Sequence, residues 1–222
     1  MRQLHKQLWI ILALGLAACA PLCWAAGNRQ SAAHAKSASA AEEAPPDKTL
    51  GSRNAPIVME VFSDYSCPMC KAFYIGAIRR MMDSYIPEGK VYLIHRDFPL
   101  KGVLGHEHSR DAARYANAAA CIGKFREVDA ALYSRQEVWT HDGSVDATVA
   151  AVLSPAEMKH VRALVASGKM DAYIDNDSAL GSSKGVRSTP TIYVTAHGQT
   201  NSLPGNLSYS LLRRYLDEQL QN

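Results

Sequence analysis

Two cysteines separated by two residues, Cys67 and Cys70, constrain this chain more than any other feature. The pair follows the apolar run 57–62 and opens a segment, 71–82, whose apolar residues recur at helical spacing. We therefore expect a strand, a short turn and a helix that begins at Cys67. At a helix start, free backbone N–H groups and the helix dipole favour the thiolate of Cys67 over its thiol. Two sulfurs one helical turn apart can close a disulfide and reopen it.

A C-x-x-C pair can also be half of a zinc site, which requires two further ligands at regular spacing. Downstream of the pair the sequence has a single cysteine, Cys121, in an alanine-rich helical segment where a small apolar residue is ordinary. His106 and His108 are interpreted as solvated loop residues. We therefore expect a redox pair, no metal and no cofactor. The formal net charge of +3 on 222 residues, without a basic run, predicts no nucleic-acid partner.

The first 25 residues have the pattern of an export signal, with a basic start and an apolar run, 8–18, too short to span a bilayer comfortably. Cleavage after Ala25 would release the chain, whereas Leu16–Cys19 resembles a lipobox, which would leave Cys19 as a lipid anchor. Both alternatives stay open, and both predict a periplasmic or other extracytoplasmic location, membrane-tethered in the second case. Residues 26–48 are rich in Ala and Ser and predict a flexible linker.

The order of strand and helix patterns predicts an α/β fold with an all-helical insertion. Two strands flank the helix that begins at Cys67, so they should be parallel. A long stretch without strand patterns follows; residues 124–138 read as one amphipathic helix, and Ser154–Glu157 is a capping box with proline. Two more strands and a last helix come next. The predicted parts are βαβ in residues 49–105, helices in residues 106–184, and ββα in residues 185–222.

A second motif, Thr189-Pro190, lies immediately before a predicted strand. A proline there is a natural site for a cis peptide bond, although base rates alone favour trans. With C-x-x-C at the first helix, this order resembles the thioredoxin fold, and the helical insertion resembles its DsbA-like branch. The motifs that carry this resemblance are Leu50-Gly51, Asn54-Ala55-Pro56, Phe62-Ser63-Asp64-Tyr65, Asp97-Phe98-Pro99-Leu100 and Arg187-Ser188-Thr189-Pro190-Thr191.

The resemblance implies a thiol:disulfide oxidoreductase. Cys67 would be the exposed nucleophile with a low pKa and Cys70 its buried partner, with Pro68-Met69 completing the active-site loop. A cis Pro190 would face them, and the backbone of Thr189 would bind an extended segment of a client protein. The partners implied are client proteins with thiols or disulfides, and a membrane redox partner that recycles the enzyme.

Two features depart from related enzymes. Many members carry a buried Glu six residues before the first Cys, where it relays a proton to the buried sulfur. Here that position is Val61, and strand alternation turns Glu60 to the opposite face. Residues 27–48 are too short and too polar for a dimerisation domain, so we expect a monomer. Asp64, before the pair, is interpreted as a turn former.

The direction of electron flow is the least constrained part of this interpretation. Export and the monomeric character favour donation of disulfides to client thiols. One alternative is a disulfide reductase or isomerase that a membrane donor keeps reduced. The other is a non-catalytic binding module on a thioredoxin scaffold.

Overall fold

The computed structural model of this protein describes residues 45–221. The predicted export signal, its lipobox at Leu16–Cys19 and most of the predicted linker lie outside the described residues. In chain order the elements are β1 (Thr49–Leu50), β2 (Ile57–Ser63), α3 (Pro68–Phe73), the π-helical segment η1 (Tyr74–Ile78), α4 (Arg79–Met82), β3 (Val91–Asp97), α5 (Ser109–Cys121), α6 (Phe125–Ser134), α7 (Gln136–Asp142), α8 (Val145–Ala150), α9 (Pro155–Ala166), α10 (Met170–Ser183), β4 (Thr191–Ala196), β5 (Gln199–Leu203) and α11 (Tyr209–Gln221).

The strands form one mixed sheet in the order β1-β3-β2-β4-β5. β2 and β3 are parallel, as the strand–helix–strand pattern predicts, with Ile57 beside Val91 and Ser63 beside Asp97. β4 runs antiparallel to both β2 and β5. The predicted α/β fold with a helical insertion is confirmed. Because β2 and β3 end at the same edge of the sheet, the loops that follow them meet there.

β1 is a strand that the sequence does not reveal, since two residues are too few to display a period. It pairs antiparallel with β3 at the edge of the sheet. Lys48, immediately before it, is buried, and its ammonium group binds the carboxylates of Asp97 and Asp177. The predicted linker through residue 48 is therefore too long, because its last residue is anchored in the interior.

The helix that begins at the C-x-x-C pair is not continuous. α3 passes into η1, where the N–H of Arg79 donates to the carbonyl oxygen of Tyr74, and α4 then ends at Met82. Tyr74 and Met82 are both buried. The apolar residues of 71–82 recur at a spacing that also fits an ordinary α-helix, so the sequence does not reveal the wider π-helical turn of η1.

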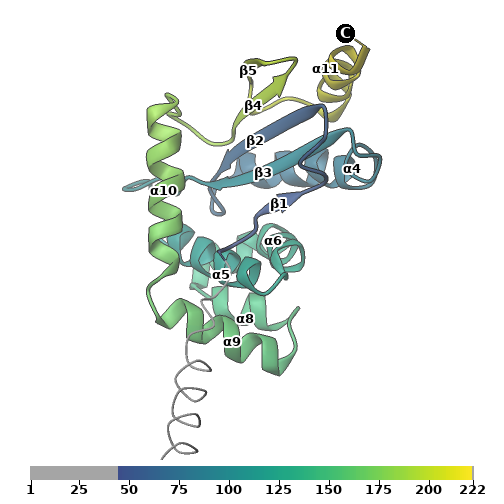
Figure 1. Cartoon of the computed structure of the whole chain (residues 1–222). Coiled ribbons are helices and arrows are strands. Elements are labelled where there is room, and N and C mark those ends of the chain that lie inside the picture. The colour runs from purple at the N-terminus through teal and green to yellow at the C-terminus, as the bar shows by residue number, and fades with distance from the viewer. Residues whose placement is uncertain (1–44, 222) are drawn as a thin grey trace, which may run out of the picture. The chain divides into compact units, whose positions relative to one another are not determined.

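Six helices, α5 to α10, make up the insertion, and Figure 1 shows α5, α6, α8 and α9 grouped together with α10 running beside the sheet. The prediction of one helix over 124–138 is wrong, because the chain turns at Arg135 between α6 and α7. This turn buries Trp139 completely, and its indole N–H donates to the carbonyl oxygen of Leu132 at 2.7 Å. The capping box is confirmed, since Ser154 and Glu157 exchange both hydrogen bonds.

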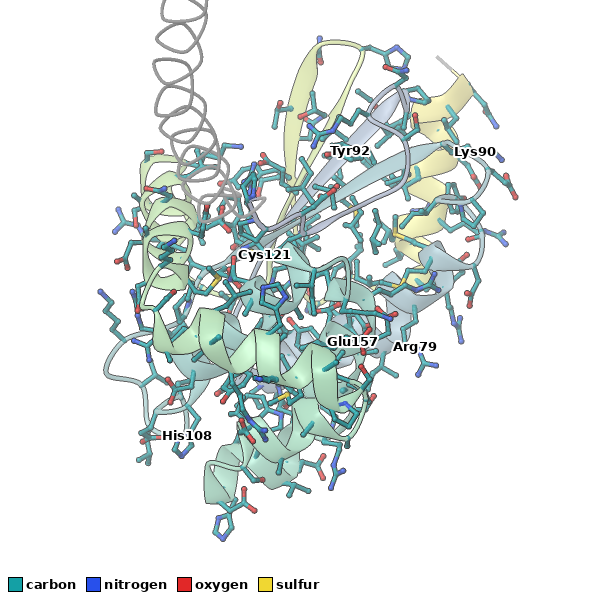
Figure 2. All side chains as sticks on the ribbon, turned by 60° about the horizontal axis from the view of Figure 1, so that its bottom comes forward. Arg79, Lys90, Tyr92, His108, Cys121 and Glu157 are labelled. Atoms are coloured by element: carbon teal, nitrogen blue, oxygen red, sulfur yellow. The ribbon has the colours of Figure 1, made fainter. Side chains whose placement is uncertain are left out.

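One continuous core joins the sheet to the insertion. Ala112 and Ala116 of α5 are fully buried, and such small side chains let neighbouring helices approach closely. Cys121, at the end of α5 (Figure 2), is half-buried against this core. In the described part of the chain, no helix combines the length and the apolar character needed to cross a membrane.

Candidate active site

Cys67 and Cys70 lie where the sequence predicts, at the start and in the first turn of α3. Cys67 is the N-cap residue with extended backbone, and Pro68 is the first helical residue, where its missing N–H costs nothing. Cys67 is 6% exposed and Cys70 2%, whereas Met69 between them is 48% exposed. The expectation of an exposed nucleophile is therefore wrong in degree. Little of Cys67 reaches the surface, because the loop before β4 lies against its sulfur.

That loop carries the second predicted motif. The peptide bond between Thr189 and Pro190 is cis, as predicted. Sγ of Cys67 lies 3.4 Å from the carbonyl oxygen of Thr189, to which it donates a hydrogen bond when it is protonated, across 122 positions of sequence. On its other side, Gly205 lies so close that a Cβ atom there would be 2.1 Å from the carbonyl oxygen of Pro190. The fold thus brings the two motifs into contact and leaves little space around them.

The two thiols hold their protons with very different affinity. A hydrogen bond from the Cys70 thiol, supported by the backbone N–H groups of Met69 and Cys70, lowers the pKa of Cys67 to about 5 against the opposing effect of burial. Burial above all, and then the neighbouring Cys67 sulfur, raise the pKa of Cys70 well above that of an ordinary thiol. At neutral pH the pair is a thiolate beside a thiol, which suits a nucleophile and a resolving group.

Asp64 holds the active-site loop to the insertion, a role beyond the predicted turn former. Its carboxylate is 1% exposed. It accepts hydrogen bonds from Ser66 N (2.7 Å), Leu100 N (2.7 Å) and the Ser109 hydroxyl (2.5 Å), and lies 2.8 Å from Nδ1 of His106. The prediction of His106 as a solvated loop residue is wrong, since its ring binds this buried carboxylate.

Gln136, at the start of α7, is a second clamp on the same loop. Its side-chain amide donates to the carbonyl oxygens of Tyr65 (2.6 Å) and Cys67 (3.0 Å). No motif marks Gln136 in the sequence, because its partners lie about 70 positions upstream and a lone glutamine has no pattern. The insertion therefore helps to set the backbone of the C-x-x-C turn.

The two strand residues that bear on proton transfer lie as predicted. Val61 is on the side of the sheet that faces Cys70. Glu60 is on the opposite face, where it pairs with Arg96 at 3.0 Å and with Lys184. Among residues 45–221, no group of three or more His, Cys, Asp or Glu side chains could hold a metal ion.

Comparisons with known proteins agree with this geometry. A family model described as thioredoxin matches residues 43–218. A probable disulfide bond formation protein D from Bacillus cereus is 23% identical over 184 residues, which cover 78% of this chain and 79% of that protein. The crystal structure of oxidised BdbD from Bacillus subtilis matches with a TM-score of 0.63 at 18% identity, over 81% of this chain and 98% of that one. The thiol-disulfide exchange protein alpha-DsbA2 from Wolbachia pipientis matches with a TM-score of 0.59 at 25% identity, over 78% and 86%.

Proposed function

Because this chain belongs to the thioredoxin family and is a DsbA-like thiol:disulfide oxidoreductase, we propose that it works in the oxidising direction and donates its disulfide to the thiols of client proteins. The observation that carries the proposal is the low pKa of Cys67, about 5. A thiolate stabilised in this way favours the reduced form of the enzyme, so the oxidised form gives its disulfide away readily.

In the proposed reaction a client thiolate attacks Cys67 of the Cys67–Cys70 disulfide. The bond between the two sulfurs breaks, Cys70 leaves with the electron pair and takes up a proton, and Cys67 becomes joined to the client. A second client thiolate then attacks the client sulfur of this mixed disulfide and releases Cys67 as a thiolate. The client loses two electrons to the enzyme, which a membrane redox partner would reoxidise.

The client would bind as an extended segment along Thr189 and Pro190, opposite Pro68-Met69. The half-exposed side chain of Met69 supports this arrangement, since it offers an apolar contact next to the sulfur. A groove of about 390 Å³ also begins at Met69 and runs between η1 and the loop 205–210. Its length would accommodate client residues that flank the reacting cysteine.

An extracytoplasmic setting belongs to the same proposal. It is supported by the export signal predicted in residues 1–25, since disulfides form and persist outside the cytosol. Lipid anchoring at Cys19 and a monomeric state remain predictions from the sequence. Both can be tested on the exported protein, by metabolic labelling with a fatty acid and by light scattering.

Equilibration with glutathione tests the direction. We expect a reduction potential of about −200 mV or higher, in the range of disulfide donors, whereas a value near −270 mV, that of thioredoxin, would favour the reductase alternative. Cys70→Ser should accumulate mixed disulfides with clients on non-reducing gels, and Cys67→Ser should capture none. A protein that exchanges disulfides in neither direction would support the binding-module alternative.

A further inference from the structure

A small, partly enclosed cavity of about 20 Å³ lies against Cys70, between the sheet, the first helix and α6. A cavity of this size can hold one water molecule when polar groups line it. The polar residues around it, apart from Cys70 itself, are Lys48, Ser63, Tyr74, His95, Asp129 and Tyr133. The buried thiol therefore faces a space suited to a hydrogen-bonded water.

Asp129 is the carboxyl group in this wall. It lies on α6, is 3% exposed, and accepts a hydrogen bond from the Tyr65 hydroxyl at 2.9 Å. Its nearest cationic candidate is His95, with Nδ1 3.9 Å from the carboxylate. No ion pair within residues 45–221 joins Asp129 to a lysine or arginine, in contrast to the buried Asp97, whose carboxylate binds Lys48. Its negative charge is therefore poorly compensated, and the carboxyl group can take and release a proton.

Cys70 needs such a group. Its sulfur must gain a proton when the enzyme disulfide opens and lose it when the disulfide closes, yet Cys70 is only 2% exposed. The strand position beside it is Val61, which cannot carry a proton, and Glu60 lies on the other face of the sheet. The polar side chains of the cavity wall are therefore the candidates for supplying this proton.

We propose that Asp129 exchanges this proton with Cys70 through one water molecule in the cavity. When the enzyme disulfide opens, the carboxyl proton of Asp129 passes to the water as a water proton passes to the Cys70 thiolate, which leaves a carboxylate and a thiol. When Cys70 attacks a mixed disulfide at Cys67, the proton returns along the same path. The inference rests on the exchange reaction proposed above, but it holds for either direction of electron flow.

The groups that face Asp129 support this assignment. Burial is the main reason that the pKa of Asp129 is raised to about 6, close to the pH at which a proton relay must work. The three neighbouring hydroxyls are those of Tyr65 on the active-site loop, Tyr74 on η1 and Tyr133 on α6. Burial raises the pKa of each further above the ordinary value, so they remain protonated donors across the neutral range.

The remaining charged neighbours lie on β3 and just before β1. Nε2 of His95 and Oδ1 of Asp97 lie 3.5 Å apart, and within the described chain neither atom has a hydrogen-bond partner. Asp97 is held ionised by Lys48, which keeps its pKa well below the usual range in spite of burial. His95 is therefore the competing relay, and the experiment must separate it from Asp129.

The test follows the first-order step in which Cys70 resolves a mixed disulfide. Reduced enzyme is mixed with saturating oxidised glutathione between pH 4.5 and 8, and release of the second glutathione is timed by stopped flow. In the unaltered protein we expect the rate to rise with a midpoint near pH 6. Asp129→Asn should lose this midpoint and be slower by about 10²-fold at pH 7. Glu60→Gln, the matched control on the other face, should retain both the midpoint and the rate.

Further variants separate the relay from a structural role. Tyr65→Phe removes the hydroxyl that donates a hydrogen bond to Asp129, so the midpoint of the rate against pH should shift upward. This variant tests the relay even if Asp129→Asn does not fold. A rate that falls equally at every pH in Asp129→Asn, with its midpoint unchanged, would overturn the proposal. A midpoint that survives Asp129→Asn and vanishes in His95→Gln would also overturn it. If the unaltered protein never resolves the mixed disulfide, the proposed function fails instead.

Discussion

Lowering the pH from 7 to 5 should remove most of the stability that the Cys67 thiolate gives the reduced protein. The pKa of Cys67 is about 5 in the folded state and about 8.5 in an unfolded chain. Because the folded value is the lower one, this stability is fully present above pH 8.5 and is lost as the pH falls through 5. The contribution is about 2.7 kcal/mol at pH 7 and about 0.4 kcal/mol at pH 5. The value at pH 7 corresponds to about 60 mV of oxidising potential.

The assay is urea unfolding of the reduced and the disulfide forms at pH 5, 6 and 7. The free energy of unfolding of the reduced form, minus that of the disulfide form, should fall by about 2 kcal/mol from pH 7 to pH 5. Groups that titrate alike in both forms cancel in this difference. Cys67→Ser, which has no thiolate at this position, should show none of this decrease relative to the disulfide form. A difference that stays constant between pH 5 and 7 would refute the thiolate and, with it, the proposed direction.

Three further predictions concern the residues that support the site. Gly205→Ala should lower the free energy of unfolding by about 1–3 kcal/mol and slow disulfide exchange, because the added Cβ would displace the Pro190 loop. Gly76→Ala is the control: its Cβ meets open space, and it should change the free energy of unfolding by less than about 1 kcal/mol. Urea unfolding measures the stability of both variants, and insulin reduction measures their exchange rate. Asp64→Ala should lower the free energy of unfolding, measured with urea, by at least about 3 kcal/mol, since it leaves several donors without an acceptor. A decrease below about 1 kcal/mol would contradict the role of Asp64 as a clamp. Lys48→Met should lower the free energy of unfolding by about 3–5 kcal/mol at pH 7 and by less at pH 4, where Asp97, left without its lysine partner, can be protonated, while Asp177 keeps its ion pair with Arg96; an equal loss at both pH values would speak against the buried ion pairs.

The sequence by itself determined the redox-active cysteine pair and the order of strands and helices along the chain. Cys67 and Cys70 at a strand-to-helix turn, Pro190 before a strand, and the strand-free stretch between them are signals carried by neighbouring residues. Each follows from local spacing or from a residue that restricts its own backbone, so each can be read without knowing the rest of the structure. The same holds for the orientation of Glu60, which strand alternation alone predicts.

Only the tertiary structure decided what surrounds the sulfurs. Tyr65 and Asp129 meet across 64 positions of sequence, and Gln136 reaches Cys67 across 69. Neither Asp129 nor Gln136 belongs to a pattern, because a single polar residue on a helix is ordinary until a packed neighbour buries it. Burial also removed Cys67 from the exposed surface. Whether a side chain is solvated, buried or paired depends on contacts between distant segments, and local spacing contains no record of them.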